Sequence, residues 1–352
     1  PDALRQVGKL LAEAARPVVM AGAGVYWDGA EAALVGAAEA LGLPVLMNGL
    51  GRGAVPASHP LAFSRARSAA LREADLVVVV GSPLDFRLGF GQFPGGARVV
   101  HVVEDPALVA GHVDLAASGA GDLTKALEMI AAAAGSTDRS EWLERLTAEE
   151  RSRRDDEERA LRRATSPIHP ARVYGELRAR LEPDAVVIVD GGDFGSYAGK
   201  YIDTETPGCF LDPGPYGCLG TGPGYALAAR LAHPDRQVFM MLGDGAAGFS
   251  LMDFDSLVRH GAPVVAIVGN NGLWGLEKHA MRALYGYDVV ADLRPGTRYD
   301  QVVAALGGHG ELVSDPNEIG PAIDRALASG VPALVNVLTD PEDTYPRSSV
   351  LM

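Results

Sequence analysis

One stretch of the sequence combines an acidic turn with a following amide, and these residue types suit a divalent cation that holds phosphate groups. The turn is Gly243-Asp244-Gly245, and the amide is Asn271, the second residue of an Asn-Asn pair. A hard cation such as Mg2+ prefers oxygen ligands, so Asp244 offers a carboxylate, Asn271 an amide oxygen and Leu273 a backbone carbonyl. Glycines beside the aspartate allow backbone N–H groups to approach phosphate oxygens. We therefore expect a metal and phosphate site here.

The surrounding segments predict the elements that position these residues. Residues 237–242 and 263–268 are apolar runs typical of buried strands, and each run ends shortly before one of the two candidate ligands. Between them, residues 249–260 have the pattern of a helix whose N-terminus would point at the bound anion. Both ligands would then lie at the carboxyl ends of strands, where open α/β sheets bind ligands.

Helix-like and strand-like segments alternate along the whole chain, which predicts an α/β fold with two doubly wound parallel sheets. Residues 138–163 are densely charged with both signs, as expected for a solvated connecting helix. We therefore expect a Rossmann-like domain over residues 1–135, a charged helical linker over residues 136–166 and a second α/β domain with the acidic turn over residues 167–352.

Composition favours a cytoplasmic enzyme that acts on small molecules. Among the 352 residues, 45 are acidic and 31 are basic, and the formal charge of −14 argues against a nucleic-acid partner. No apolar run is long enough for a transmembrane helix, and no signal peptide is visible. The two cysteines, Cys209 and Cys218, cannot form a disulfide framework and fit a reducing compartment.

Four segments carry a resemblance to a known family. Residues 243–275 (GDGAAGFSLMDFDSLVRHGAPVVAIVGNNGLWG) and 214–231 (GPYGCLGTGPGYALAARL) resemble the diphosphate-binding domain of thiamine diphosphate enzymes of the acetolactate synthase-like group. Residues 47–61 (MNGLGRGAVPASHPL) and 74–91 (ADLVVVVGSPLDFRLGFG) resemble the central domain of the same group. The resemblance is specific in the second half of the chain and looser in the first.

This resemblance implies a thiamine diphosphate and Mg2+ site in the domain over residues 167–352. Asp244, Asn271 and the Leu273 carbonyl would bind Mg2+, and Leu219 would hold the cofactor in its bent, reactive conformation. The residues that would contact the cofactor are Gly192, Asp193, Phe194, Gly195, Gly217, Leu219, Gly243, Gly245, Ala246, Asn271 and Gly275.

The resemblance further implies C–C bond cleavage or formation on 2-keto acids, with the cofactor as nucleophile. Trp274, Leu276 and Glu277 begin a helix that would face the substrate. Near Ala280 the sequence departs from biosynthetic acetolactate synthases, which place a tryptophan there. A 2-hydroxyacyl-CoA lyase or an oxalyl-CoA decarboxylase-like enzyme is therefore the alternative, and a non-catalytic nucleotide-binding or regulatory subunit is an alternative of another class.

The first domain contains candidates for a nucleotide site. In relatives this domain binds FAD, which makes the protein a flavoprotein, or an ADP moiety of an acyl-CoA ligand. The candidate residues here are Gly22, Gly24, Arg87, Glu104 and Asp105. The alternative is a tight turn at the glycines, since position 27 is Trp27 and the full dinucleotide motif is absent, together with surface charges at strand ends.

The resemblance also implies a catalytic group that no residue of this sequence matches. In the family, a glutamate of a preceding pyrimidine-binding domain activates the cofactor. We expect that domain to be supplied by missing sequence or by another chain, within a homodimer or homotetramer. The present chain is then expected to be inactive alone.

Overall fold

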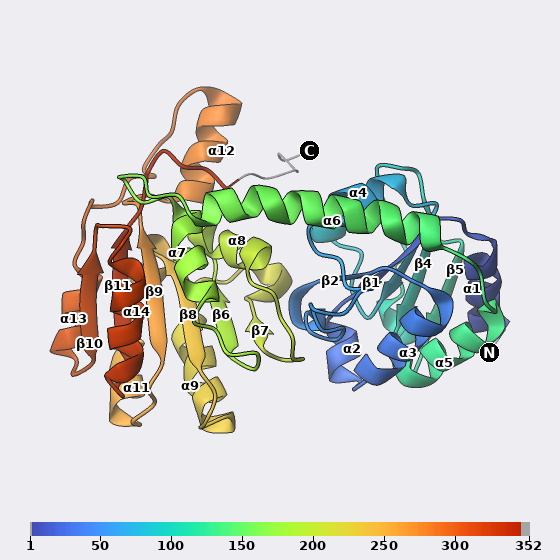
Figure 1. Ribbon diagram of the computed structural model, residues 1–352, viewed down its shortest axis with the longest axis horizontal. Coiled ribbons are helices and arrows are strands. Elements are labelled where there is room, and N and C mark those ends of the chain that lie inside the picture. Colours follow the sequence, from blue (N-terminus) through green and yellow to red (C-terminus); the bar gives the residue numbers. More distant parts are fainter. Residues whose placement is uncertain (1, 346–352) are drawn as a thin grey trace. The chain divides into compact units, whose positions relative to one another are not determined.

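Two α/β units make up residues 2–345, the part of the chain that the computed structural model describes (Figure 1). Unit 1 comprises the residues up to Asp156 together with Asp203–Phe210, and unit 2 comprises Glu157–Ile202 and the residues from Leu211 onward. Helix α6 (Ser140–Leu161) includes residues of both units. The prediction of an α/β fold with two parallel sheets is confirmed.

Unit 1 is built on a five-stranded sheet whose pairings are all parallel. In sheet order the strands are β2 (Val45–Met47), β1 (Pro17–Ala21), β3 (Leu76–Val80), β4 (Arg98–Val103) and β5 (Ala117–Ala120). Every residue of β1 and β3 is buried, as their continuous aliphatic runs predict for a sheet covered on both faces. The sequence pattern does not indicate β5, because its sequence Ala-Ser-Gly-Ala has no branched aliphatic residue.

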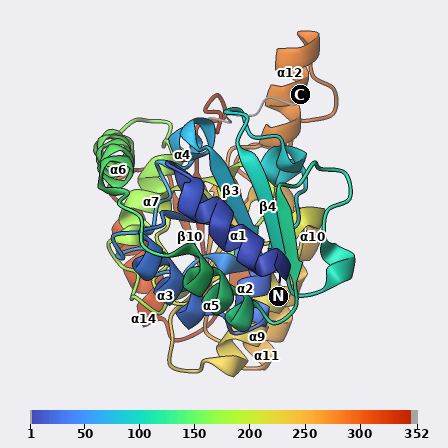
Figure 2. The same ribbon diagram turned by 90° about the vertical axis from the view of Figure 1, so that its right-hand side faces the viewer.

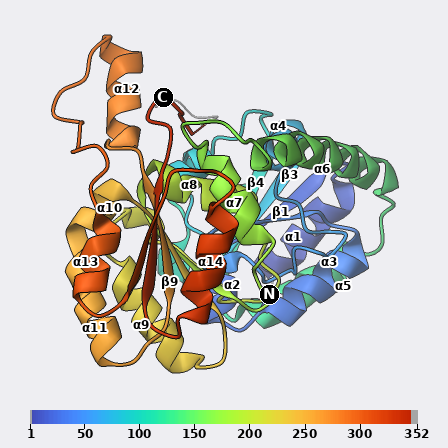
Figure 3. The same ribbon diagram turned by 60° about the vertical axis from the view of Figure 1, so that its left-hand side comes forward.

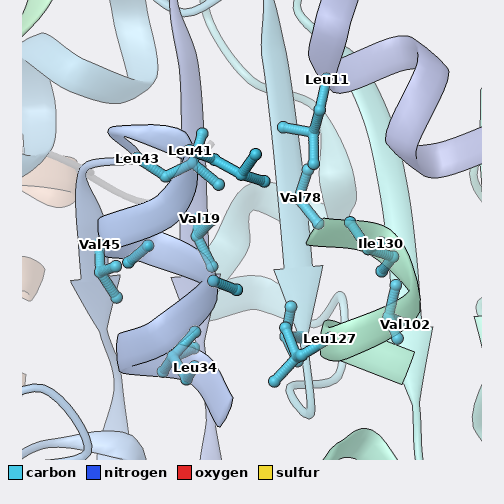
Figure 4. Close-up of a cluster of buried hydrophobic side chains, with 14 of the residues drawn as sticks. Leu11, Val19, Leu34, Leu41, Leu43, Val45, Val78, Val102, Leu127 and Ile130 are labelled. Carbon is cyan, nitrogen blue, oxygen red and sulfur yellow. The ribbon is translucent and has the colours of Figure 1, made fainter. Parts of the chain in front are cut away.

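Helices cover both faces of this sheet. Helices α1 (Asp2–Glu13), α3 (Glu31–Leu41) and α5 (Leu123–Ala134) lie over one face (Figure 2). Figure 4 shows leucine and isoleucine side chains of these helices packed against the strand valines Val19, Val78 and Val102.

The charged helix α6 is anchored to the other face of the unit 1 sheet. Its Trp142 and Leu146 are buried there, and the Trp142 indole N–H donates to the carbonyl of Pro17 at 3.0 Å. The N-terminal half of α6 is therefore amphipathic, with a buried apolar side, so it is more than a solvated connector.

Unit 2 contains a six-stranded sheet that brings the candidate ligands together. In sheet order the strands are β10 (His309–Val313), β11 (Ala333–Leu338), β9 (Val265–Asn270), β8 (Val238–Gly243), β6 (Val186–Asp190) and β7 (Phe210–Leu211). The pairings from β10 through β6 are parallel. The carboxyl ends of β6, β8 and β9 therefore lie side by side.

Helices cover both faces of this sheet as well. On one side α7 (Pro170–Arg178) packs against α8 (Gly192–Tyr201) and α14 (Ile319–Ala328), and on the other side lie α9 (Gly222–Ala232), α11 (Phe254–Arg259) and α13 (Tyr299–Ala305). Figure 3 shows α14 and α13 on opposite sides of the strands. Within residues 2–345, no helix is both long and apolar enough to cross a membrane.

The predicted helix over residues 249–260 is wrong at its start. Helix α10 (Asp244–Ser250) begins directly after β8, and a short 3-10 turn (Leu251–Asp253) separates it from α11. The alanines Ala246 and Ala247 are buried, so the helix can start against the sheet without larger apolar residues. Because these small residues show no helical periodicity of hydrophobicity, the sequence pattern placed the start too late.

Candidate cofactor site

Three adjacent strands of unit 2 deliver the polar residues of the site. In the parallel register Asp190 of β6 lies beside Leu242 of β8, and Gly243 of β8 lies beside Gly269 of β9. The residues that follow these strand ends are Gly191, Asp244 and Asn271, two of which the sequence singled out as metal ligands. This is the carboxyl edge at which parallel sheets bind ligands.

The Asp244 carboxylate is almost fully buried, with a relative exposure of 2%. One oxygen accepts the N–H of Gly245 at 3.0 Å, and the other accepts the N–H of Gly272 at 2.7 Å. Burial raises the pKa of Asp244 to about 6, although these backbone hydrogen bonds oppose the shift. Within residues 2–345 no Lys, Arg or His forms an ion pair with it. A buried carboxylate in this state fits a divalent cation, because the cation supplies the counter-charge that the protein does not.

Asn271 and Leu273 lie in the loop that Asp244 holds. The Asn271 side-chain oxygen accepts the N–H of Leu273 at 3.1 Å, and Gly272 between them has a left-handed φ of +72°. Because Asp244 bonds to Gly272, the carboxylate and the amide belong to one hydrogen-bonded turn. Over residues 2–345 no group of three or more His, Cys, Asp and Glu side chains could hold a metal. A cation at Asp244 would therefore depend on amide, carbonyl, phosphate and water oxygens, as Mg2+ commonly does.

Glycines leave open space at the strand ends. A Cβ added at Gly192, Gly217 or Gly243 would meet no atom within 4 Å, so the packing of the chain itself does not require glycine for space at these positions. Gly217 and Gly192 also have left-handed φ values of +61° and +79°. The first turn of α10, which is the positive end of the helix dipole, begins beside this space. The residues present therefore fit a bound diphosphate.

Leu219 and Trp274 pack against two other glycines of the site. A Cβ at Gly191 would overlap the Leu219 side chain, and a Cβ at Gly245 would lie 2.7 Å from the Trp274 ring. These two side chains therefore need the adjacent glycines in order to approach the strand ends. Ala246 is buried in the first turn of α10.

The sequence reasoning missed Asp190, the last residue of β6. Its carboxylate is fully buried and accepts the N–H of Gly220 at 2.8 Å and that of Gly222 at 2.9 Å. Burial raises the pKa of Asp190 above its ordinary value, while these backbone hydrogen bonds oppose the rise. Asp190 thus ties the loop that carries Leu219 to the strand end. The only sequence signal was an aspartate at the end of an apolar run.

The segment after β6 forms the first turn of α8, and its side chains point in different directions. The Asp193 carboxylate is buried beside Asn271 and Gly275: the Cβ of a side chain at Gly275 would lie 3.2 Å from that of Asp193. Phe194 packs its ring against Gly269 and stacks at a tilt on Tyr174, with ring centroids 5.2 Å apart. Gly195 packs against Val189. Phe194 and Gly195 therefore face the core, and their backbone alone is available to a ligand.

The helix α12 (Gly275–Tyr285) starts at the end of the Asn271 loop, as the sequence predicts. Trp274 precedes it, and the ring of Phe249 meets the Trp274 ring edge to face with centroids 6.0 Å apart. Leu276 and Glu277, in the first turn, line an open apolar groove along the helix. The three residues expected on the substrate side therefore share one surface.

In unit 1, the candidate glycines are explained by close packing between two loops. The Gly22 N–H donates to the carbonyl of Val80 at 2.9 Å, and the Gly24 N–H donates to that of Gly81 at 2.7 Å. A Cβ at Gly24 would lie 2.5 Å from the Glu104 carboxylate. Glycine is therefore required at positions 22 and 24 for the loops after β1 and β3 to pack together, with or without a bound nucleotide.

Replacing Gly22 by alanine is expected to destabilise unit 1 by about 1–3 kcal/mol, since the new Cβ would lie 2.6 Å from the Gly81 carbonyl oxygen. Gly36→Ala is the matched control, because Gly36 is an exposed position of α3 where a Cβ meets nothing within 4 Å. That substitution is expected to stabilise the protein by about 0.5–1 kcal/mol. Urea unfolding of both variants measures the difference, and equal midpoints would contradict the packing argument.

Two other unit 1 candidates, Arg87 and Asp105, form hydrogen bonds with residues close to them in the sequence. Arg87 forms a paired hydrogen bond with Asp85 two residues earlier, at 2.8 Å and 3.2 Å. Asp105 accepts the N–H of Ala107 at 2.8 Å and caps the short turn after β4. Both side chains therefore have local structural roles.

The sequence reasoning also missed Arg67, at the start of α4 (Arg67–Glu73). Its guanidinium contacts the Met20 sulfur at 3.4 Å, and within residues 2–345 no carboxylate pairs with it. Burial lowers the pKa of Arg67 to about 10, and the neighbouring charges of Arg52 and Arg87 lower it further. The positive charges of Arg52 and Arg87 therefore act on Arg67, for which the described part of unit 1 provides no matching anion.

Comparison with known proteins agrees with this arrangement. Residues 4–130 match the family described as "Thiamine pyrophosphate enzyme, central domain", and residues 190–337 match "Thiamine pyrophosphate enzyme, C-terminal TPP binding domain". The chain is 58% identical over 351 residues to "Acetolactate synthase large subunit IlvG" of Mycobacterium tuberculosis (strain ATCC 25618 / H37Rv). The aligned region covers 99% of this chain and 64% of that protein.

Two further relatives carry the name "2-hydroxyacyl-CoA lyase 2". The protein of Caenorhabditis elegans is 33% identical over 97% of this chain and 56% of its own length, and that of Homo sapiens is 31% identical over 96% and 55%. The chain thus spans less than two thirds of the length of these relatives. The resemblance seen in the sequence is confirmed: this chain belongs to the thiamine pyrophosphate enzyme family.

Proposed function

We propose that this chain binds thiamine diphosphate through Mg2+ at the carboxyl edge of the unit 2 sheet and serves an enzyme of the acetolactate synthase-like type, which cleaves or forms C–C bonds of 2-keto acids. The observation that carries the proposal is the state of Asp244. Its carboxylate is 2% exposed, accepts hydrogen bonds from two backbone N–H groups and has no cationic partner among the described residues.

Different residues of the chain would bind the cation and the phosphate groups of the cofactor. Asp244, the Asn271 side-chain oxygen and the Leu273 carbonyl would hold the cation, and the Ala246 N–H, in the first turn of α10, would bind a phosphate oxygen. Asp193, buried near Gly275 and the Asn271 amide, would lie beside the bound cofactor. When bound, the cofactor supplies a nucleophilic carbon and an electron sink for C–C bond chemistry.

Orientation and exclusion of water would come from the apolar residues. Leu219, held by the loop that Asp190 anchors, would support the ring system of the cofactor. Trp274 covers Gly245 and would shield the reacting atoms from water.

Calorimetric titration with thiamine diphosphate tests the cofactor part of this proposal. Binding is expected with Mg2+ present and is expected to be lost when EDTA removes the metal. Equal binding with and without Mg2+, or no binding in either condition, would refute the proposed site. Once the pyrimidine-binding domain with its glutamate is supplied, product analysis separates the activities, since pyruvate gives acetolactate in one case and a 2-hydroxyacyl-CoA is cleaved to an aldehyde in the other.

The lone guanidinium of Arg67 favours a second function, the binding of a nucleotide phosphate in unit 1. FAD, ADP or the ADP moiety of CoA would each supply the anion that Arg67 lacks in the described chain, near the positive charges of Arg52 and Arg87. We place Arg67 at the centre of this site, because Arg87 is already paired with Asp85.

Replacing Arg67 by methionine is expected to weaken binding of ADP or FAD about 10- to 100-fold, since a charge-assisted hydrogen bond to phosphate contributes about 1.5–3 kcal/mol. Arg72→Met is the control, because Arg72 lies on the same helix with 57% of its side chain exposed. Fluorescence titration with FAD and calorimetry with ADP measure the affinities. Equal losses of affinity in both variants would show that the loss comes from the lower net positive charge and not from a contact of Arg67. If the unsubstituted chain binds neither ADP nor FAD, the nucleotide site is refuted.

A further inference from the structure

We propose that the groove beside α12 binds the alkyl part of the substrate, so that the preferred substrates carry an unbranched apolar chain longer than the methyl group of pyruvate. This inference rests on the proposed function, because it assigns a substrate class to the same site. The groove has a volume of about 530 Å3. Its apolar lining comes from Trp274, from Leu276, Met281 and Leu284 of α12, and from Val289 and Val290 of the loop that follows.

The groove starts at the candidate cofactor loop. Trp274 lines it, and the ring of Trp274 also lies over Gly245, next to Asp244. Leu276 follows two residues later along the same face. A substrate whose carbonyl group reaches the cofactor would therefore place its next carbon atoms at the entrance of the groove.

The far wall of the groove is hydrogen-bonded to the cofactor loop. The backbone N–H of Trp274 donates to the carbonyl of Ala291 at 2.9 Å. The backbone N–H of Leu293 donates to the carbonyl of Gly272 at 2.7 Å. These bonds form an antiparallel bridge between Leu273 and Asp292. The wall and the loop of the candidate metal ligands are therefore one continuous structure.

A buried lysine holds this wall against α12. Lys278 is 7% exposed and forms ion pairs with Asp292 and, at 3.8 Å, with Asp288. Arg282, one turn later, pairs with Asp288 at 2.5 Å. The charged groups thus lie behind the wall, and the groove itself stays apolar. Among its described lining residues the charged one is Glu277, which disfavours a second carboxylate at the end of the substrate chain.

The wall presents apolar side chains to solvent at the cost of backbone strain. Val290 has a left-handed φ of +55°, which is unfavourable for a β-branched residue, and it is 91% exposed. Val289 and Leu284 are also exposed, at 57% and 49%. Exposed apolar side chains gathered around one groove are typical of a ligand-binding surface, and a chain of methylene groups fits this lining without polar partners.

The test is calorimetric titration of the chain, with Mg2+ and thiamine diphosphate present, using a series of linear 2-hydroxy acids: lactate, 2-hydroxybutanoate, 2-hydroxyhexanoate and 2-hydroxyoctanoate. We expect the affinity to rise about two- to fourfold per added methylene, as burial of that group implies. In Leu284→Asp this rise is expected to disappear for the longer acids. Ala283→Asp, an exposed neighbour on the same helix outside the groove, is expected to keep it.

Each outcome supports or overturns a specific claim. Thiamine diphosphate binding with a flat chain-length series would overturn the substrate class and leave the proposed function standing. An unchanged series in Leu284→Asp would overturn the proposal, and a shift of that variant from dimer to monomer in sedimentation would then assign the groove to an interface between two copies. Absence of thiamine diphosphate binding would overturn the proposed function and this inference with it.

Discussion

Replacing Asp244 by alanine is expected to weaken Mg2+-dependent binding of thiamine diphosphate by about 100-fold or more, because removing a residue behind the ligands of a metal site already costs about 10- to 100-fold. The substitution removes the one carboxylate of the candidate ligand set. It also leaves the Gly245 and Gly272 N–H groups without their acceptor, so the loop that carries Asn271 loses its anchor. Calorimetry with saturating Mg2+ measures the loss.

Asp253→Ala is the matched control, since Asp253 is an exposed acid in the turn after α10. It is expected to bind the cofactor as the unsubstituted chain does. The pH gives an independent check: the Asp244 pKa of about 6 means that protons compete with the cation as pH falls through 6. Mg2+ affinity is therefore expected to fall up to about tenfold per pH unit below 6 and to level off above 7. A pH-independent Mg2+ affinity would show that another group binds the metal.

Replacing Asp190 by alanine is expected to destabilise unit 2 by about 2–4 kcal/mol, because two N–H groups lose their buried acceptor. Those groups belong to Gly220, which directly follows Leu219, and to Gly222, the first residue of α9. Burial of the Asp190 carboxylate is itself unfavourable, as its raised pKa indicates. Alanine removes this buried charge, and that gain offsets part of the lost stability. Urea unfolding measures the change.

Two further variants separate the role of Asp190 from general effects of charge. Asp190→Asn keeps one side-chain oxygen as acceptor and is expected to lose about half as much stability. Asp235→Ala, at an exposed position before β8, is expected to change stability by less than about 0.5 kcal/mol. If Asp190→Ala and Asp235→Ala unfold at the same urea concentration, Asp190 does not anchor the Leu219 loop.

The parts of the site that the sequence predicted are those fixed by neighbouring residues in the chain. Asp244 and Asn271 each follow an apolar strand, so the alternation of strands and helices is enough to place both at one sheet edge. The start of α12 was expected from the family resemblance of the same segment. Parallel register then requires the strand ends to meet, as the pairing of Gly243 with Gly269 shows.

The parts that were missed depend on contacts between distant residues. Asp190 acts through N–H groups 30 and 32 residues later, and a side chain so far away leaves no periodic signal. Arg67 stands out because no carboxylate of the described chain approaches it, which only a folded structure can show. The early start of α10 depends on the fit of two alanines against the sheet.

The antiparallel bridge between Leu273 and Asp292 makes the affinities of two ligands interdependent. A ligand in the groove and a cation at Asp244 would each order the same short stretch of backbone, so whichever binds first lowers the entropic cost for the other. Thermodynamic reciprocity then requires the cation to strengthen ligand binding by the same factor by which the ligand strengthens cation binding. The apparent Mg2+ requirement of the protein would therefore decrease as the alkyl chain of its substrate lengthens.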